Sequence, residues 1–166
     1  MEELKIALSE ARAERIVITG SNGYFAAGAD IGELMHLSGA AALDYARRGQ
    51  RLMKSIEQNP AVVIAAIDGY CLGGGLDLAI ACDLRYATAR SIFAHPGGRI
   101  GIMTGWGGTR RLPLIIGKTR ALEMMAAGRR IDAAEALEWG LVGGVVANPV
   151  DHSFGVELRD SNGRSS

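Results

Sequence analysis

The central stretch of the chain, residues 61–82, reads AVVIAAIDGYCLGGGLDLAIAC. Its first seven residues are apolar throughout, which is the pattern of a parallel strand covered on both faces. A run of three glycines, Gly73 to Gly75, follows a short extended piece, and residues 76–82 carry apolar side chains at the spacing of a helix. A buried strand, a glycine loop and a helix in this order predict an α/β fold.

Helices and strands alternate on both sides of this stretch. Apolar stripes predict helices at residues 1–13, 40–58, 109–116, 119–127 and 132–139. Short apolar or β-branched runs predict strands at residues 15–19, 84–87, 91–94 and 141–146. Residues 24–31 and 95–108 are rich in small residues without a period and predict loops, the first of which leads into a short helix. We therefore expect one core over residues 1–146 and a polar tail with little order over residues 147–166.

Composition limits the possible partners. The 166 residues carry 18 basic and 18 acidic side chains, and a net charge of zero argues against nucleic acid or an anionic membrane held by bulk electrostatics. The two cysteines, Cys71 and Cys82, lie in apolar sequence, which excludes a disulfide scaffold and favours a reducing compartment. The start of the chain has no basic stretch leading into an apolar run, and no window reaches the ~18 apolar residues of a membrane span. We expect a cytoplasmic protein with no nucleic-acid and no membrane partner.

The glycine run has two interpretations. At the start of a helix, backbone N–H groups point outward and the helix dipole adds about half a positive charge, so an anion or a developing oxyanion is stabilised there. The alternative is a tight turn that packs the helix against the strand. The segment GGGLDL at residues 73–78 matches neither GxGxxG nor the phosphate loop that ends in Gly-Lys-Ser/Thr, which disfavours a dinucleotide-binding fold.

Four motifs occur in order along the chain: FAAGADI at residues 25–31, DGYCLGGGLDLA at residues 68–79, ACDLR at residues 81–85 and GGTRRLP at residues 107–113. Together they resemble the successive signatures of the enoyl-CoA hydratase/isomerase (crotonase) family. The resemblance runs from about residue 1 to residue 146 and implies a spiral of repeated ββα units that binds an acyl-CoA thioester. It also implies an activity of the lyase or isomerase type in fatty-acid metabolism, and relatives that form homotrimers or hexamers. Coenzyme A is then part of the substrate, so no separate cofactor is expected, and no His, Cys, Asp or Glu spacing suggests a metal site.

The resemblance also assigns roles to residues. The two backbone N–H groups that polarise the thioester carbonyl in the family correspond to Ala29 and Gly74, and losing one such donor typically costs about 10²–10³ in rate. The residues expected to contact the acyl-CoA are Ala27, Ala29, Asp30, Ile31, Gly32, Gly73, Gly74 and Trp106. Trp106 either caps the acyl pocket or simply packs beside the glycines that flank it.

The acid/base positions depart from the family's pattern. Hydratases of the family carry two glutamates, and the corresponding positions here hold Asp77 and Gly97. Asp77 is shorter than glutamate by one methylene, and nothing replaces the carboxylate at Gly97 in register. The nearest titratable side chain is His95, which either takes part in the acid/base chemistry or packs as an ordinary histidine.

Three functions follow as alternatives. The first is an enzyme of the enoyl-CoA hydratase/isomerase type that stabilises an enolate. The second is an acyl-CoA-binding relative without catalysis, and the third is an inactive fragment; both take account of the glycine at position 97. Relative to the family, we expect the chain to lack the first strands and most of the C-terminal helices that close the pocket and build the trimer, so its own assembly stays open.

Overall fold

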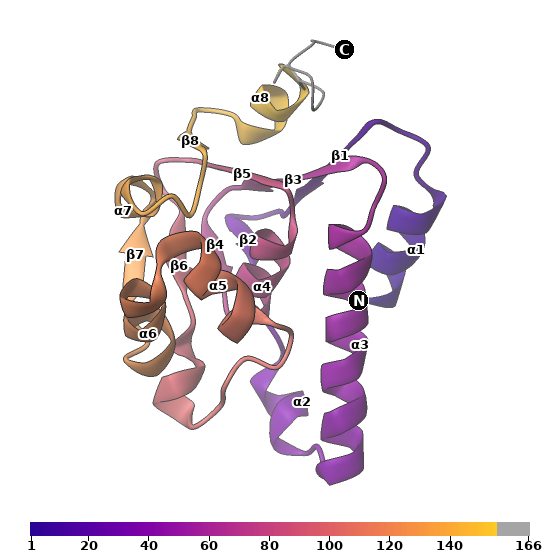
Figure 1. Cartoon of the computed structure of the whole chain (residues 1–166), viewed down its shortest axis with the longest axis vertical. Coiled ribbons are helices and arrows are strands. Elements are labelled where there is room, and N and C mark those ends of the chain that lie inside the picture. Colours follow the sequence, from indigo (N-terminus) through magenta and orange to yellow (C-terminus); the bar gives the residue numbers. More distant parts are fainter. Residues whose placement is uncertain (156–166) are drawn as a thin grey trace.

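Two four-stranded sheets organise residues 1–155, the part of the chain that the computed structural model describes (Figure 1). The first sheet is parallel and contains, in order, β1 (Arg15–Thr19), β3 (Val62–Ile67), β5 (Leu84–Ala87) and β8 (Gly144–Val145). The second sheet contains, in order, β2 (Tyr24–Ala26), β4 (Tyr70–Leu72), β6 (Ile92–Ala94) and β7 (Arg130–Asp132). Its strands are parallel except for the antiparallel pair of β6 and β7.

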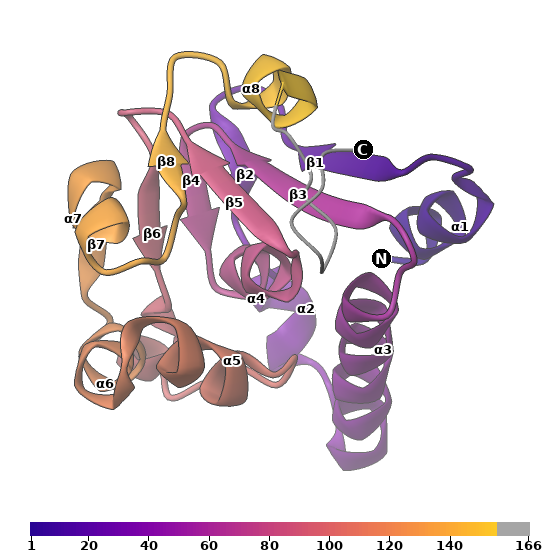
Figure 2. The ribbon, with the colours of Figure 1, turned by 45° about the horizontal axis from the view of Figure 1, so that its top comes forward.

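The helices lie around and between these sheets. In chain order they are α1 (Glu2–Glu10), α2 (Ile31–Met35), α3 (Gly39–Glu57), α4 (Gly74–Ala81), the 3₁₀ helix η1 (Pro96–Ile100), α5 (Gly108–Ile116), α6 (Lys118–Ala126), α7 (Ala133–Glu138) and α8 (Pro149–Gly155). In Figure 2, α4 lies below the strands with α3 on one side and α5 on the other, and it contacts both of these helices. Within residues 1–155, no helix is long and apolar enough to cross a membrane.

The chain repeats one arrangement three times: a strand in the first sheet, a strand in the second sheet, and then helix. β1 and β2 precede α2 and α3, β3 and β4 precede α4, and β5 and β6 precede η1 and α5. Equivalent strands of successive repeats pair in parallel, as Ile18 of β1 does with Ala65 of β3, because the helix between them returns the chain to the same end of the sheet. The α/β class and the repeated ββα units predicted from the sequence are confirmed.

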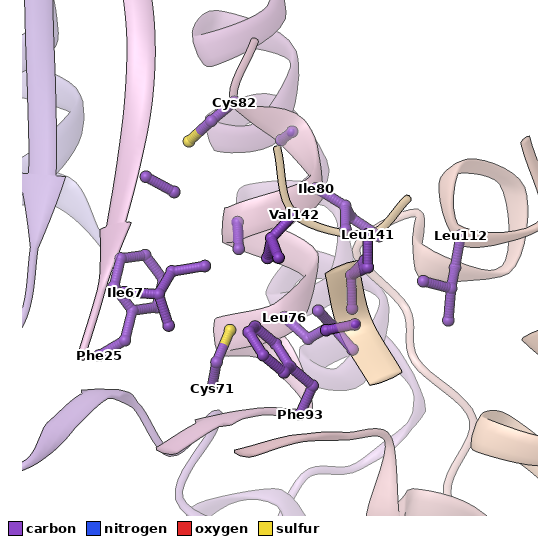
Figure 3. Close-up of a cluster of buried hydrophobic side chains, with 14 of the residues drawn as sticks. Phe25, Ile67, Cys71, Leu76, Ile80, Cys82, Phe93, Leu112, Leu141 and Val142 are labelled. Carbon is purple, nitrogen blue, oxygen red and sulfur yellow. The ribbon is translucent and has the colours of Figure 1, made fainter. Parts of the chain in front are cut away.

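The core joins side chains from both sheets and from α4 (Figure 3). Phe25, Ile67 and Phe93 come from three different strands and belong to the same buried cluster as Leu76 of α4, which lies beside Phe93 in Figure 3. Five of the six residues of β3 are buried, as expected for a strand covered on both faces. Both cysteines lie in this core, and burial raises the pKa of the Cys82 thiol to about 12.

Two short strands lie where the sequence predicts none. Residues 24–31 predict a loop, yet Tyr24–Ala26 forms β2 and pairs in parallel with β4. β7 precedes α7 and pairs with β6. Each strand has three residues, which is too short to show a period, and only the pairing with a neighbouring strand defines it.

A helix, α8, lies within residues 147–166, for which the sequence predicts little order. The Asn148 side-chain oxygen accepts hydrogen bonds from two amides of the first turn, and Pro149 opens the helix, which together make a favourable start. Arg15 of β1 donates a hydrogen bond to a carbonyl near the end of α8 (2.8 Å), and α8 also contacts β3. The first residues of the predicted tail are therefore helical and attached to the first sheet, while residues 156–166 lie outside the described part.

Candidate active site

A cavity of about 310 Å³ opens beside the start of α4. Its wall comes from the loop after β2, from α2 and α3, from the start of α4 and from the chain between β6 and α5. Apolar side chains in the wall include Ile31, Leu34, Leu37, Ile102 and Met103. The wall also carries the polar side chains of Tyr45, Asp77, His95 and Thr104. The cavity therefore combines an apolar lining with a small group of polar side chains.

The loops after β2 and β4 meet at this cavity. β2 and β4 pair in parallel, so their carboxyl ends lie at the same edge of the second sheet. Gly28 has a φ of +95°, and a Cβ on it would come within 3.2 Å of the Gly74 amide nitrogen. This close approach favours glycine and sets Ala29 and Gly74 in the same cavity wall.

The helix α4 begins without a side-chain cap. Gly73 precedes it with a φ of +54°, and the Gly73 amide donates a hydrogen bond to the Ala94 carbonyl of β6 (2.9 Å). Both Gly73 and Gly74 line the cavity. Because the first amides of a helix carry partial positive charge, this edge of the cavity favours a negatively charged or strongly polarised oxygen.

Asp77 lies in the first turn of α4 and is close to two polar side chains. It is only 1% exposed, and its Oδ2 accepts a hydrogen bond from the Thr104 hydroxyl. Its Oδ1 lies 3.3 Å from Nε2 of His95, which is 4% exposed. These two atoms do not have hydrogen-bond geometry with each other or with any other group in residues 1–155. The structure thus brings the two candidate acid/base residues of the sequence together in the cavity wall.

Position 97 offers no space for a side chain. A Cβ on Gly97 would lie 2.3 Å from the Ile102 carbonyl oxygen. The Ile102 amide in turn donates a hydrogen bond to the Gly97 carbonyl (2.8 Å), which closes the chain around η1. Gly97 lines the cavity with backbone alone, so a carboxylate at this position would require the backbone to move.

Trp106 fills the space between α3 and α4. A Cβ on Gly49 would lie 2.1 Å from the indole ring, and a Cβ on Gly74 would lie 2.5 Å from it. The centroid of the indole lies 5.5 Å from that of the Tyr45 ring. Burial and, after it, the negative charge of Glu33 raise the pKa of Tyr45. Trp106 is therefore packed between α3 and α4, and it also lines the cavity.

Arg111 of α5 holds the loop that carries Trp106. Its guanidinium donates two hydrogen bonds to the Glu57 carboxylate at the end of α3 (2.6 and 2.8 Å) and one to the Trp106 carbonyl (2.9 Å). The hydrogen bond from Arg111 lowers the pKa of Glu57 below its ordinary value. Arg111 thus ties α3 and α5 together beside the cavity.

The residues singled out in the sequence fall into two groups. Those that line the cavity are Ala27, Ala29, Ile31, Gly73, Gly74, Asp77, His95 and Trp106. Asp30 and Gly32 lie at the start of α2, where the Asp30 carboxylate accepts a hydrogen bond from the Gly32 amide (2.7 Å). Tyr45 and Thr104 line the cavity without any signal in the sequence, because no local pattern relates their segments to the glycine turn. Within residues 1–155, no cluster of three or more His, Cys, Asp or Glu residues is placed to bind a metal ion.

Known proteins share this sequence pattern and fold. The profile of the family described as Enoyl-CoA hydratase/isomerase matches residues 1–156. A curated protein of Bacillus subtilis (strain 168), named "Probable enoyl-CoA hydratase", is 43% identical over 147 residues, which cover 86% of this chain and 57% of that protein. The crystal structure of enoyl-CoA hydratase from Bacillus anthracis is 39% identical, with a TM-score of 0.83, and the match covers 93% of this chain and 61% of that one. The enoyl-CoA hydratase of Thermoplasma volcanium GSS1 is 33% identical, with a TM-score of 0.85 and coverage of 91% and 60%.

The extent of these matches establishes the family. The chain spans about three fifths of the length of the relatives that it matches. The family profile nevertheless covers almost all of this chain, including both loops that meet at the cavity. The solved relatives reproduce the same fold at more than 30% identity. The chain therefore belongs to the enoyl-CoA hydratase/isomerase family.

Proposed function

We propose that this chain acts on an acyl-CoA thioester, as an enzyme that hydrates or isomerises a 2-enoyl group through an enolate. The observation that carries the proposal is the presence of Ala29, Gly74 and Asp77 in the wall of one cavity at the start of α4. The names of the related hydratases support the same reaction class. Coenzyme A enters as the carrier part of the substrate.

The backbone amides of Ala29 and Gly74 stabilise the thioester oxygen in this proposal. When water adds to C3 of a conjugated thioester, or when a proton leaves the carbon chain, negative charge collects on that oxygen as the enolate forms. Fixed amide dipoles stabilise such charge without having to reorient, and each donor is typically worth about 10²–10³ in rate. The uncapped start of α4 adds its partial positive charge on the same side.

Asp77 is the carboxylate that transfers protons at the carbon chain. It lies in the same cavity wall as Gly74, three residues further along the first turn of α4, and its burial keeps bulk water away. The apolar wall formed by α2 and the chain after η1 suits a fatty acyl chain, which gains from leaving water. The substrate class is therefore a fatty enoyl-CoA.

Gly97 favours a second candidate, an acyl-CoA-binding protein without turnover. The position that holds the second glutamate in hydratases contributes only backbone to this cavity. A site that keeps the amides and the apolar wall but lacks sufficient acid/base groups binds the thioester and leaves it unchanged. The two candidates differ in turnover and agree in binding.

The test is the loss of 2-enoyl thioester absorbance with crotonyl-CoA and with a longer enoyl-CoA, beside calorimetric binding of butyryl-CoA. We expect turnover by the wild type and a loss of at least ~10²-fold in kcat for Asp77→Asn, since this variant removes proton transfer and keeps the shape of the side chain. The control is Asp44→Asn, because Asp44 is an exposed residue of α3 that pairs with Arg48 (3.0 Å) away from the cavity lining.

Each outcome of this test has one meaning. Binding of butyryl-CoA without turnover of either enoyl-CoA would favour the binding protein. Absence of both binding and turnover would contradict the acyl-CoA proposal altogether. Turnover that Asp77→Asn leaves unchanged would keep the substrate class and remove Asp77 from the mechanism.

A further inference from the structure

Two buried polar atoms without a hydrogen-bond partner lie next to each other in the cavity wall. They are Oδ1 of Asp77 and Nε2 of His95, 3.3 Å apart, on side chains that are more than nine-tenths buried. Buried polar atoms in native proteins nearly always have a partner, so each exception calls for an explanation. Two such atoms at one place in a cavity wall indicate a position for a polar atom of substrate or water.

Strand pairing places His95 at this position. β6 pairs with β4 in a register that sets Ala94 opposite Leu72, and the Ala94 carbonyl accepts the hydrogen bond of the Gly73 amide. His95 is the next residue after this contact, and Asp77 lies in the first turn of the helix that starts there. The fold therefore joins the histidine to the same glycine turn that carries Gly74.

We propose that Asp77 and His95 form one acid/base pair, in which the histidine does the work that the missing carboxylate at Gly97 does in related hydratases. This inference rests on the proposed function, since it names the groups that move protons in that reaction. Oδ1 and Nε2 hold the reacting water between the pair and C2–C3 of the enoyl thioester.

The proton transfers of the pair balance over one turnover. Asp77 Oδ1 takes a proton from water as the water oxygen bonds to C3, and the C2–C3 π electrons move into the thioester to give the enolate. The protonated His95 then gives its Nε2 proton to C2, and the enolate electrons form the new C–H bond. After the product leaves, a new water molecule between Oδ1 and Nε2 takes the proton of Asp77 and gives a proton to His95, which restores the starting carboxylate and imidazolium.

Thr104 is the positioning residue of this pair. Its hydroxyl donates to Oδ2 of Asp77, so one carboxylate oxygen is already held and Oδ1 remains beside His95. Gly108 keeps the neighbouring space free of a side chain. A Cβ there would lie 2.1 Å from Oδ1 and 3.1 Å from Nε2, and would cover both atoms.

The first test compares kcat and KM for crotonyl-CoA in the wild type, His95→Gln and His95→Ala. Glutamine keeps much of the size and the hydrogen-bonding capacity of histidine but does not act as an acid or a base at neutral pH. We expect kcat to fall by at least ~10²-fold in both variants while KM and butyryl-CoA binding stay close to the wild type. Added imidazole should restore part of the rate of His95→Ala and none of that of His95→Gln. His152→Gln is the control, because His152 lies on α8 outside the cavity lining and packs its ring against Tyr86 of β5.

A second pair of variants, at Thr104, tests the pair even if substitution of His95 unfolds the protein. Thr104→Val removes the hydroxyl and keeps the shape, and we expect a fall in kcat of up to ~10²-fold at unchanged butyryl-CoA binding, because the carboxylate loses its orientation. Thr104→Ser keeps the hydroxyl and should retain most of the rate.

The outcomes separate this inference from the proposed function. A wild type that turns over crotonyl-CoA with His95→Gln equally active would overturn the pair and leave the proposed function standing. A loss of binding and rate together in His95→Gln, without rescue of His95→Ala by imidazole, would assign the histidine to packing and also overturn the pair. A wild type that binds butyryl-CoA and turns over nothing would overturn the proposed function, and the pair with it.

Discussion

Gly97 and Gly105 both line the cavity, but the backbone around them differs. A Cβ on Gly97 would lie 2.3 Å from the Ile102 carbonyl oxygen. Moving this oxygen would distort the turn that the hydrogen bond from the Ile102 amide to the Gly97 carbonyl closes. A Cβ on Gly105 would lie 3.6 Å from the Ala46 Cβ, which is ordinary van der Waals contact. The glycine at position 97 is therefore part of how the loop folds, and the acid/base pair that we propose consists of Asp77 and its neighbour His95 instead.

We expect Gly97→Ala to lower the free energy of unfolding by about 1–3 kcal/mol, the usual cost of forcing extra volume into a packed site. The matched variant Gly105→Ala, in the same connection between β6 and α5, should stay within about 0.5 kcal/mol of the wild type. Denaturant unfolding of the three proteins measures both values. Equal stability of the two variants would show that the η1 turn relaxes around a new methyl group.

The longer elements follow from sequence pattern, whereas the site depends on contacts between elements. The apolar stripe of α3 and the covered strand β3 are visible in the chain, because each is long enough to show its period. β2 and β7 are not visible in the sequence, since a strand of three residues is too short to show an alternating pattern and only its pairing with a neighbouring strand defines it. The sequence also indicates Asp77, at a glutamate position of the family, and His95, as the titratable residue nearest to Gly97, but it does not show that the two lie together. Their 3.3 Å approach depends on the parallel pairing of β4 with β6, and the hydrogen bond of Thr104 has no sequence signal at all.

The contact between α3 and α5 predicts a pH-dependent stability. The hydrogen bond from Arg111 lowers the pKa of Glu57 below its ordinary value of 4.5. A depressed pKa means that the pair stabilises the fold above the unfolded pKa, and that this stabilisation is lost as the pH falls through the folded value. Because the Glu57 side chain is 43% exposed, solvent screens the pair and we expect no more than ~1 kcal/mol at pH 7.

The measurement is denaturant unfolding of wild type and Glu57→Gln between neutral pH and about pH 3, which lies below the unfolded value of a glutamate. We expect Glu57→Gln to be less stable at neutral pH and the two curves to converge in acid. Glu138→Gln is the control, because Glu138 is 73% exposed and lies 3.7 Å from Arg120. A difference for Glu57→Gln that persists unchanged in acid would contradict an electrostatic origin.

At the scale of the whole molecule, two sheets bring distant parts of the chain to one cavity. The alternation of strands between the sheets sets the loops after β2 and β4 at the same edge, and the connection from β6 to α5 closes the third side. This arrangement belongs to the enoyl-CoA hydratase/isomerase family, in a chain that spans about three fifths of the relatives that it matches. We propose that in this cavity the amides of Ala29 and Gly74 polarise a thioester carbonyl.

Infrared spectroscopy of bound hexanoyl-CoA, with and without ¹³C at the thioester carbonyl, measures this polarisation. The isotope difference isolates the carbonyl stretch of the ligand, and calorimetry on the same sample establishes how much ligand is bound. Two amide donors weaken the C=O bond, so we expect the carbonyl stretch at a lower frequency on the protein than in water. A bound thioester whose carbonyl frequency matches that in water, or a thioester that does not bind at all, would contradict it.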